Sequence, residues 1–201
     1  MGGITIFMKP DTAEWDEALT LLAEVLKSRN AAPCHLIVCG GAALRAEMIV
    51  SRVTKDVDVL ATRSEVDGEI SAAWPLPELL KEAVAEVAVE LGLPANWLNA
   101  STSLLIGPLE ELPPEVWKDL REKPYGPHLH ISYVGRAGQI PLKLQAAVGR
   151  NEARDLDDLK ALAPDANECR RAAHWLRRAG LDAVGERRLN ETLNLLGHGN
   201  H

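Results

Sequence analysis

The chain has 201 residues, enough for one domain of ordinary size with a small additional part, and its 46% hydrophobic content can form a packed core. A formal net charge of −7 excludes a protein that binds nucleic acid through a generally basic surface, but leaves room for a local basic patch. Three cysteines without zinc-type spacing, and no signal-peptide pattern or apolar run of membrane-spanning length, predict a cytoplasmic protein with free thiols and no membrane partner.

The chain begins with an apolar segment over residues 3–8, expected to be an edge strand or an ordered arm, and an amphipathic helix over 13–28. Residues 36–39 are apolar and partly β-branched, which favours a buried strand. Gly40 and Gly41 end that strand, and a helix is expected over 42–50. Glycine allows a tight turn and lets a ligand approach the backbone, and a helix N-terminus attracts anions. This order therefore predicts a phosphate site.

A second strand follows, marked by Val57, Val59 and Leu60, with two carboxylates at its start. Asp56 and Asp58 are two residues apart, so on a strand they would point to the same side. Adjacent carboxylates repel each other unless a cation offsets their charge. Mg²⁺ is typically held by one or two carboxylates together with substrate phosphates. The alternative is a pair of solvated acids at the end of a strand.

The order of strand, Gly40-Gly41, helix and Asp56-x-Asp58, with Thr54 leading into the second strand, resembles the signature of the nucleotidyltransferase superfamily of the DNA polymerase β type. The resemblance implies that Gly40, Gly41 and Thr54 bind a nucleoside triphosphate. It also implies that Asp56 and Asp58 are catalytic and hold Mg²⁺ or Mn²⁺, which drives attack on the α-phosphate.

The middle of the chain is predicted as an acidic loop over 63–71, a helix over 75–91, a compact segment over 93–99 with Trp97 in the core, a short helix near Val116, and a chain break at Pro124, Gly126 and Pro127. A strand is expected over 128–134, followed by a turn over 135–138. Residues 140–142 fit either another short strand or the lead into a helix. A segment similar to 93–99 follows the Asp-x-Asp strand in several bacterial nucleotidyltransferase-like proteins.

A second cluster carries Lys143 on a helix over 143–148, then Arg150, then Arg154 and the acids at 155, 157 and 158. It resembles a segment of the AbiEii-type abortive-infection toxins among the minimal nucleotidyltransferases. By this resemblance Lys143 contacts the triphosphate, and Asp155 or Asp158 supports the active site. Arg150 and Arg154 would add positive charge at the phosphates. The alternative is an ordinary helix pair with i,i+4 ion pairs on its surface.

One feature departs from that superfamily, in which many members carry a third carboxylate on a later strand. The predicted strand over 128–134 contains no acid, but has His128 and His130. These could line the site as a base or an alternative ligand, or face outward from an edge strand. The chain would then be a weak enzyme, an enzyme that uses Glu65 or Asp67 as its third acid, or an inactive relative.

The remaining helices are predicted over 154–163, 165–179 and 183–196, and their paired arginines could contact an acceptor nucleic acid or form a solvated face. We expect an α/β (α+β) fold, with a small mixed nucleotidyltransferase sheet over residues 1–142 and a helical C-terminal subdomain over 143–201. The expected function is Mg²⁺-dependent transfer of a nucleoside monophosphate to tRNA, a protein or a small alcohol, in a bacterial toxin–antitoxin or phage-defence setting. The alternative is an inactive member that acts as a binding or antitoxin partner.

Overall fold

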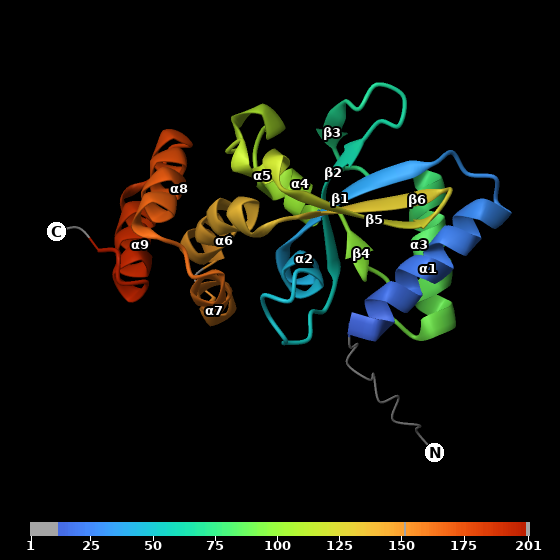
Figure 1. The fold of residues 1–201 in the computed structure, drawn as a ribbon, viewed down its shortest axis with the longest axis horizontal. Helices are drawn as coiled ribbons and strands as arrows, with labels where there is room; N and C mark the ends of the chain where they lie inside the picture. The colour runs from blue at the N-terminus through green and yellow to red at the C-terminus, as the bar shows by residue number, and fades with distance from the viewer. Residues whose placement is uncertain (1–11, 151, 200–201) are drawn as a thin grey trace, which may run out of the picture.

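The computed structural model describes residues 12–150 and 152–199, so the segment predicted over 3–8 lies outside the described part. The chain forms a mixed sheet with helices around it, followed by a helical C-terminal part (Figure 1). This confirms the predicted α/β (α+β) class. None of the helices in the described ranges has the length and apolarity that crossing a membrane requires.

The sheet is built around β1, which has a neighbour on each side. The strands are β1 (Cys34–Cys39), β2 (Val57–Arg63), β3 (Ile70–Ala72), β4 (Leu98–Asn99), β5 (Leu120–Gly126) and β6 (Leu129–Val134). Their order is β3-β2-β1-β6-β5, and β4 pairs with β2. Strand β1 runs antiparallel to β2 and parallel to β6. Its apolar run follows from this place, because a central strand covered on both faces has no solvated side.

Helices cover both faces of the sheet and then continue beyond it. They are α1 (Thr12–Ser28), α2 (Gly40–Ala46), α3 (Glu78–Leu91), α4 (Ser101–Leu105), α5 (Glu115–Lys118), α6 (Arg136–Arg150), α7 (Ala153–Leu162), α8 (Ala166–Arg178) and α9 (Ala183–Leu195), with a 3₁₀ turn η1 (Leu109–Glu111). Trp97 is fully buried, as predicted, and stacks on Trp15 with ring centroids 5.7 Å apart. Its indole N–H donates to the carbonyl of Val84, which satisfies the buried donor.

The core has three parts, and the division decides where the site lies. One part joins α1 and α3 to one sheet face through residues such as Leu36, Val38 and Val59. A second lies on the opposite face, between Ile37 and Leu60 of the sheet and α5 and α6. A third joins α6 to α7, α8 and α9. Because strand side chains alternate, Asp58 lies on the same face as Leu60.

Helix α6 links the second and third parts of the core, and it starts earlier than the sequence pattern predicts. Residues 135–138 were expected to turn, but α6 begins at Arg136 and includes Pro141. A Cβ on Gly138 would lie 2.8 Å from the Cα of Val116, so this glycine allows α5 and α6 to pack closely rather than forming a turn. The boundary expected after Leu142 falls inside α6.

Other differences concern the strands and α2. Strand β5 runs through Pro124, which is tolerated because β5 is an outer strand of the sheet. Strand β6 lies between β1 and β5, so the histidines of that segment are not on an edge strand, as one interpretation expected. Residues 70 and 71, expected in a loop, belong to β3. Helix α2 starts at Gly40 itself and ends at Ala46, shorter than predicted.

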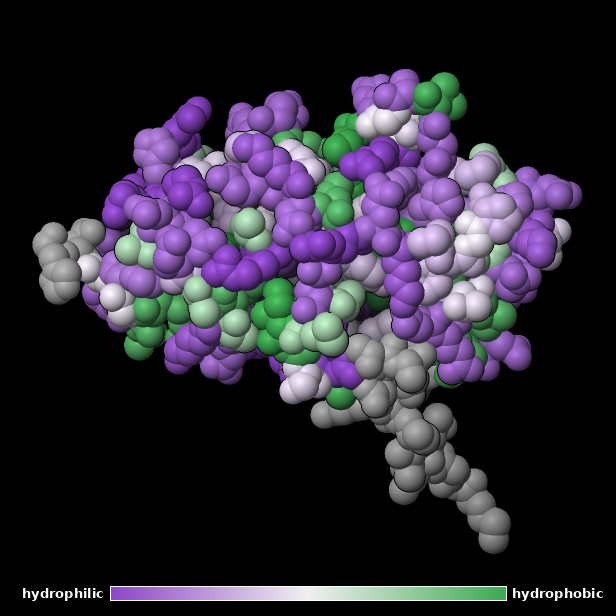
Figure 2. Space-filling model, in the orientation of Figure 1, coloured by the Kyte–Doolittle hydropathy of each residue, from purple (hydrophilic) through white to green (hydrophobic). Residues whose placement is uncertain are grey.

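Figure 2 shows one face of the molecule covered mainly by hydrophilic residues, with small separate apolar patches between them. Single exposed apolar side chains include Val66, Val89 and Leu105. Scattered exposed apolar residues are normal on a folded protein and need no special explanation.

Candidate functional site

The two aspartates predicted to hold a metal lie where β2 begins, opposite the end of β1. Asp58 pairs in register with Cys39, the last residue of β1, and Asp56 comes two residues before it, just outside the strand. A Cβ on Gly40 would lie only 2.8 Å from the Oδ2 atom of Asp58, and Gly40 has a φ of +70°. Both facts require glycine at this position. The Asp58 carboxylate therefore lies directly against bare backbone.

The charges of the two acids are poorly compensated. Burial and the nearby charge of Asp56 raise the pKa of Asp58 to about 6, against a 3.3 Å hydrogen bond donated by Thr102. Burial also raises the pKa of Asp56, although the charges of Arg154, Lys55 and other cations oppose the shift. A cation between the two carboxylates would favour their ionised forms. This is the electrostatic signature of a site that gains from binding a cation.

A cavity of about 300 Å³ opens beside Asp58. Its polar lining comes from Gly40, Asp58, Thr102, Gln139, Lys143 and Arg150, and its apolar lining includes Leu105, Ile106 and Leu142. Asp56 does not line this cavity. The lining thus combines charged and polar groups with aliphatic carbon, a composition that suits a ligand with an anionic end and an apolar ring.

The two glycines are held by neighbours that fix the start of α2. The backbone N–H of Gly40 donates to the Gln139 side chain at 3.2 Å, and Gln139 in turn donates to the carbonyl of Val134. A Cβ on Gly41 would lie 2.7 Å from the Thr54 hydroxyl. Thr54 is buried and donates to the carbonyl of Asp56 at 3.2 Å. Thr54 therefore positions the segment that carries Asp56.

Lys143, predicted to contact a triphosphate, lies between two buried acids. Its ammonium nitrogen is 3.1 Å from Asp155 Oδ1 and 2.7 Å from Asp158 Oδ2, and the residue is only 6% exposed. Arg52 donates two hydrogen bonds to Asp158, at 2.9 and 2.6 Å. Burial acts to raise the pKa of Asp158, but the hydrogen bonds from Arg52 and Lys143 outweigh it and lower that pKa. Lys143 thus links α6 to α7 through its ion pairs, and it also lines the cavity.

The two predicted arginines differ in their contacts. Arg150 reaches Asp155 at 3.1 Å, yet its side chain is 56% exposed and lines the cavity. Arg154 is exposed on α7, and its charge opposes the rise in the pKa of Asp56. The structure therefore brings Gly40, Asp58, Lys143 and Arg150 to one cavity. Asp158 is buried behind them as an ion-pair partner.

Three polar residues of this region were not singled out from the sequence: Arg52, Thr102 and Gln139. Gln139 was hidden by the incorrect turn over 135–138, since a helix from Arg136 would have placed it on a buried first turn. Arg52 and Thr102 reach Asp158 and Asp58 from segments 106 and 44 residues away in the chain. A single sequence holds no local signal for such contacts.

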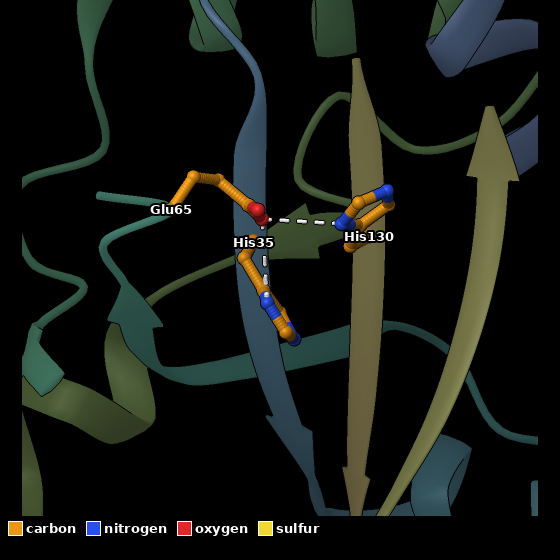
Figure 3. A group of neighbouring side chains, drawn as sticks. All are labelled: His35, Glu65 and His130. Atoms are coloured by element: carbon orange, nitrogen blue, oxygen red, sulfur yellow. Dashed lines mark hydrogen bonds and ion pairs between the residues drawn. The ribbon is translucent and has the colours of Figure 1, made fainter. Parts of the chain in front are cut away.

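The histidines of the β6 region do not lie at this cavity. His128 contacts the carbonyl of Ala31, while His130 and His35 both approach Glu65 (Figure 3). Glu65 follows the end of β2, whereas Asp58 is near its start, and a strand rises about 3.3 Å per residue. Glu65 is therefore directed away from the Asp56–Asp58 pair, and does not supply it with a third acid. The His35, Glu65 and His130 group could itself hold a metal ion.

Comparison of the chain with protein-family models, with curated proteins and with solved structures gave no match. Membership of the nucleotidyltransferase superfamily stays a prediction that rests on the sequence motifs. What the chain does must be argued from the side chains gathered at its own cavity.

Proposed function

We propose that this chain is a Mg²⁺-dependent nucleotidyltransferase that moves a nucleoside monophosphate from a nucleoside triphosphate to an acceptor. The observation that carries the proposal is the position of Asp58. Its carboxylate has a raised pKa beside Asp56 and lies against the bare backbone of Gly40. The same cavity presents Lys143 and Arg150. Carboxylates suit the metal ion of a metal-bound triphosphate, and bare glycine backbone and two positively charged side chains suit its phosphates.

The residues fit the metal that the proposal requires. Asp56 and Asp58 offer hard carboxylate oxygens, and their raised pKa values reflect burial and, at Asp58, the nearby charge of Asp56. When bound there, Mg²⁺ would neutralise charge that develops on the reacting phosphate and the leaving pyrophosphate. Thr54 holds the backbone of Asp56 through its carbonyl, so the first acid is oriented before any ligand arrives.

The other cavity residues have roles that follow from their chemistry. Arg150 is the more exposed of the two cations, so it can reach phosphate oxygens with paired donors. Lys143 contributes positive charge to the cavity, in the position where Asp155 and Asp158 hold it. Leu105, Ile106 and Leu142 offer apolar surface to a nucleobase. In the transfer, the acceptor oxygen bonds to the α-phosphorus, the bond to the pyrophosphate oxygen breaks, and the proton of the acceptor passes to water.

A second function is favoured by two observations. Lys143 is neutralised by two acids, and strand β6 carries no acid that could complete a set of three. A chain with this site could bind a nucleotide without transferring it and act as the binding or antitoxin partner of another protein. The two functions share the same cavity and differ only in turnover.

The deciding experiment offers each α-labelled nucleoside triphosphate, with Mg²⁺ or Mn²⁺, to the chain in a cell extract. The proposal predicts that label moves to a macromolecule or small alcohol, and that Asp58→Asn abolishes the transfer. Asp157→Asn is the matched control, because Asp157 is an exposed acid on α7. Metal-dependent nucleotide binding without transfer supports the non-catalytic alternative. A chain that neither binds nor transfers a nucleotide contradicts both.

A further inference from the structure

A group of metal-ligand type lies on the sheet away from the cavity of Asp58. His35 comes from β1, His130 from the neighbouring β6, and Glu65 from the turn between β2 and β3 (Figure 3). His35 and His130 are paired in the register of the two parallel strands. Side chains at paired positions of neighbouring strands share a face, so the pairing itself brings the two rings together. One ligand atom from each of the three residues lies within 4.8 Å of the others.

The distances match those between the ligands of one metal ion. The Nδ1 atoms of His35 and His130 lie 3.4 and 3.1 Å from the same oxygen of Glu65. Ligands about 2.1 Å from a tetrahedral Zn²⁺ are about 3.4 Å from each other. The imidazole rings are perpendicular, at 87°, so neither ring covers the nitrogen of the other. The three donor atoms converge without any change of backbone.

A further contact supports His35 as a ligand. Its second nitrogen, Nε2, lies 2.6 Å from the hydroxyl of Ser132, which is fully buried. A histidine that binds a metal through one ring nitrogen almost always donates a hydrogen bond from the other, and this partner fixes the orientation of the ring.

The surroundings leave room for a fourth ligand. His35 is buried, whereas the side chains of His130 and Glu65 are 39% and 36% exposed, so solvent reaches the ligand atoms from one side. Arg63 is the cation near this group, and it is paired with Glu122 at 3.0 Å. Three protein ligands with an open position are typical of zinc sites that keep a bound water.

We propose that His35, Glu65 and His130 form a binding site for a divalent transition metal ion, Zn²⁺ by preference, with water as the fourth ligand. Imidazole nitrogen suits Zn²⁺ and its neighbours in the first transition row, whereas Mg²⁺ prefers oxygen ligands. This site is separate from the Asp56–Asp58 pair in position and in ligand chemistry. It does not depend on the proposed function.

The bound ion fastens the turn over residues 64–69 to the sheet. That turn is closed by the amide of Ser64 donating to Glu69 and the amide of Gly68 donating to Ser64, and Val66 at its tip is 95% exposed. Glu65 is the residue of the turn that contacts both histidines. A metal ion held by Glu65 and two strands therefore lowers the rate at which the turn opens.

The experiment uses the full chain after treatment with a chelator. Zn²⁺ is titrated against a chromophoric competitor, and Co²⁺ is added separately because its absorption reports tetrahedral nitrogen and oxygen ligation. We expect one ion per chain, a higher melting temperature with Zn²⁺, and slower hydrogen exchange at the amides of Ser64 and Gly68. Equal concentrations of Mg²⁺ should not compete for this site.

Three variants locate the ion. His130→Ala should lose the one-to-one binding, and because His130 is partly exposed the chain should still fold. Ser132→Ala should weaken Zn²⁺ binding about ten- to hundredfold, as loss of a hydrogen-bond partner to a ligating histidine usually does. His174→Ala is the matched control, since His174 is an exposed histidine on α8.

The double variant Asp56→Asn with Asp58→Asn should bind Zn²⁺ like the unmodified chain, which separates this proposal from the nucleotide site. Binding that is no tighter in the unmodified chain than in His130→Ala overturns the metal site. Equal loss in His174→Ala and His130→Ala overturns the assignment to these residues. Unchanged exchange at residues 64–69 with Zn²⁺ bound overturns the fastening of the turn.

Discussion

The molecule contains two pairs of aspartates in opposite surroundings. One pair, the sheet acids, is Asp56 and Asp58 at the start of β2, and the other, the α7 acids, is Asp155 and Asp158. The α7 acids receive Lys143 and two arginines, and the pKa of Asp158 is held below its usual value despite burial. Among the residues that the structure describes, no lysine or arginine forms an ion pair with Asp56 or Asp58, and burial raises the pKa of each. Asp158 is only 1% exposed and still has a lowered pKa, so burial alone does not explain the difference in pKa between the two pairs.

The difference teaches how to separate structural acids from binding acids. A buried acid whose charge is matched within the fold contributes to holding its neighbours in place, and removing its partner leaves an uncompensated charge. An acid left short of positive charge costs stability until a ligand supplies that charge. On this contrast, the α7 acids have a structural role, and Asp56 and Asp58 form the proposed cation site.

The largest effect is expected at Lys143. Lys143→Ala should destabilise the chain by about 3–5 kcal/mol, because Asp155 and Asp158 would lose a shared buried cation. Urea unfolding measures the change. Lys160→Ala, an exposed lysine on α7, is the control and should change little. A Lys143→Ala variant as stable as the unmodified chain would show that Lys143 is not structural, and would remove the distinction between the two acid pairs.

The next effect concerns ligand binding at the sheet acids. Mg²⁺ with a nucleoside triphosphate at a hundredfold excess over its Kd should stabilise the folded chain by about 2.7 kcal/mol, since the ligand binds only that form. Asp56→Asn with Asp58→Asn should remove the metal-dependent part, because the carboxylates that would bind the ion are gone. Thermal melts with and without metal measure both. Equal shifts in the two proteins contradict the site.

A smaller effect of opposite sign is expected from Asp58→Asn without ligand. The pKa of Asp58 is raised to about 6 in the folded chain, so that state holds the proton more tightly than the unfolded chain, where an aspartate pKa is about 3.9. Stability therefore falls as pH rises from about 4 to about 6 and stays lowered above that. Asp58→Asn should stabilise the chain by roughly 1–2 kcal/mol at pH 8 and by little at pH 4.

Asp158→Asn is the counterpart, measured by urea unfolding at the same two pH values. The pKa of Asp158 is lowered on folding, so its ionised form contributes stability above about pH 3.9 that is lost as pH falls through the folded pKa. This variant should therefore destabilise the chain at pH 8. If both variants shift stability in the same direction at pH 8, the contrast between the acid pairs is wrong.

The sequence predicted the elements that carry strong local signals. The apolar run of β1, the alternation of β6 and the amphipathic spacing of α1 gave these elements within a few residues. Trp97 was placed in the core, and the glycine pair and Asp-x-Asp were placed beside each other because only a short segment separates them. At the site, Asp58 and Gly40 share a cavity, but Asp56 and Gly41, which were expected at the same cleft, are not among its lining residues.

The features that the sequence did not predict correctly depend on contacts between distant segments. Gly138 was expected to turn the chain, but it serves close packing of α5 on α6, which no local pattern records. Lys143 was expected to face a ligand, and the structure shows that two acids twelve and fifteen residues later neutralise it. His35 and His130 come together only through the pairing of β1 with β6. Each of these outcomes needs the topology, which motif spacing does not specify.

The smallest change in stability is expected at Arg150, which lies between the two acid pairs. Its side chain is 56% exposed and reaches the buried Asp155 at 3.1 Å, and Asp155 keeps Lys143 as a second partner. Arg150→Ala should change stability by only about 0–1 kcal/mol. Its position at the cavity predicts a different result for nucleotide affinity. Loss of a charge-assisted contact costs about 1.5–3 kcal/mol, roughly a ten- to hundredfold loss in affinity.

Nucleotide titration and urea unfolding of the same variant separate the two roles of Arg150. Arg187→Ala is the matched control, because Arg187 is an exposed arginine on α9 whose ion pair with Glu191, at 4.0 Å, is solvated on both sides. Nucleotide affinity unchanged in Arg150→Ala would leave Arg150 as a surface partner of Asp155. A loss of several kcal/mol in stability would instead give Arg150 a structural role like that of Lys143. Only a variant that binds nucleotide more weakly and remains stable would support a role for Arg150 in ligand binding.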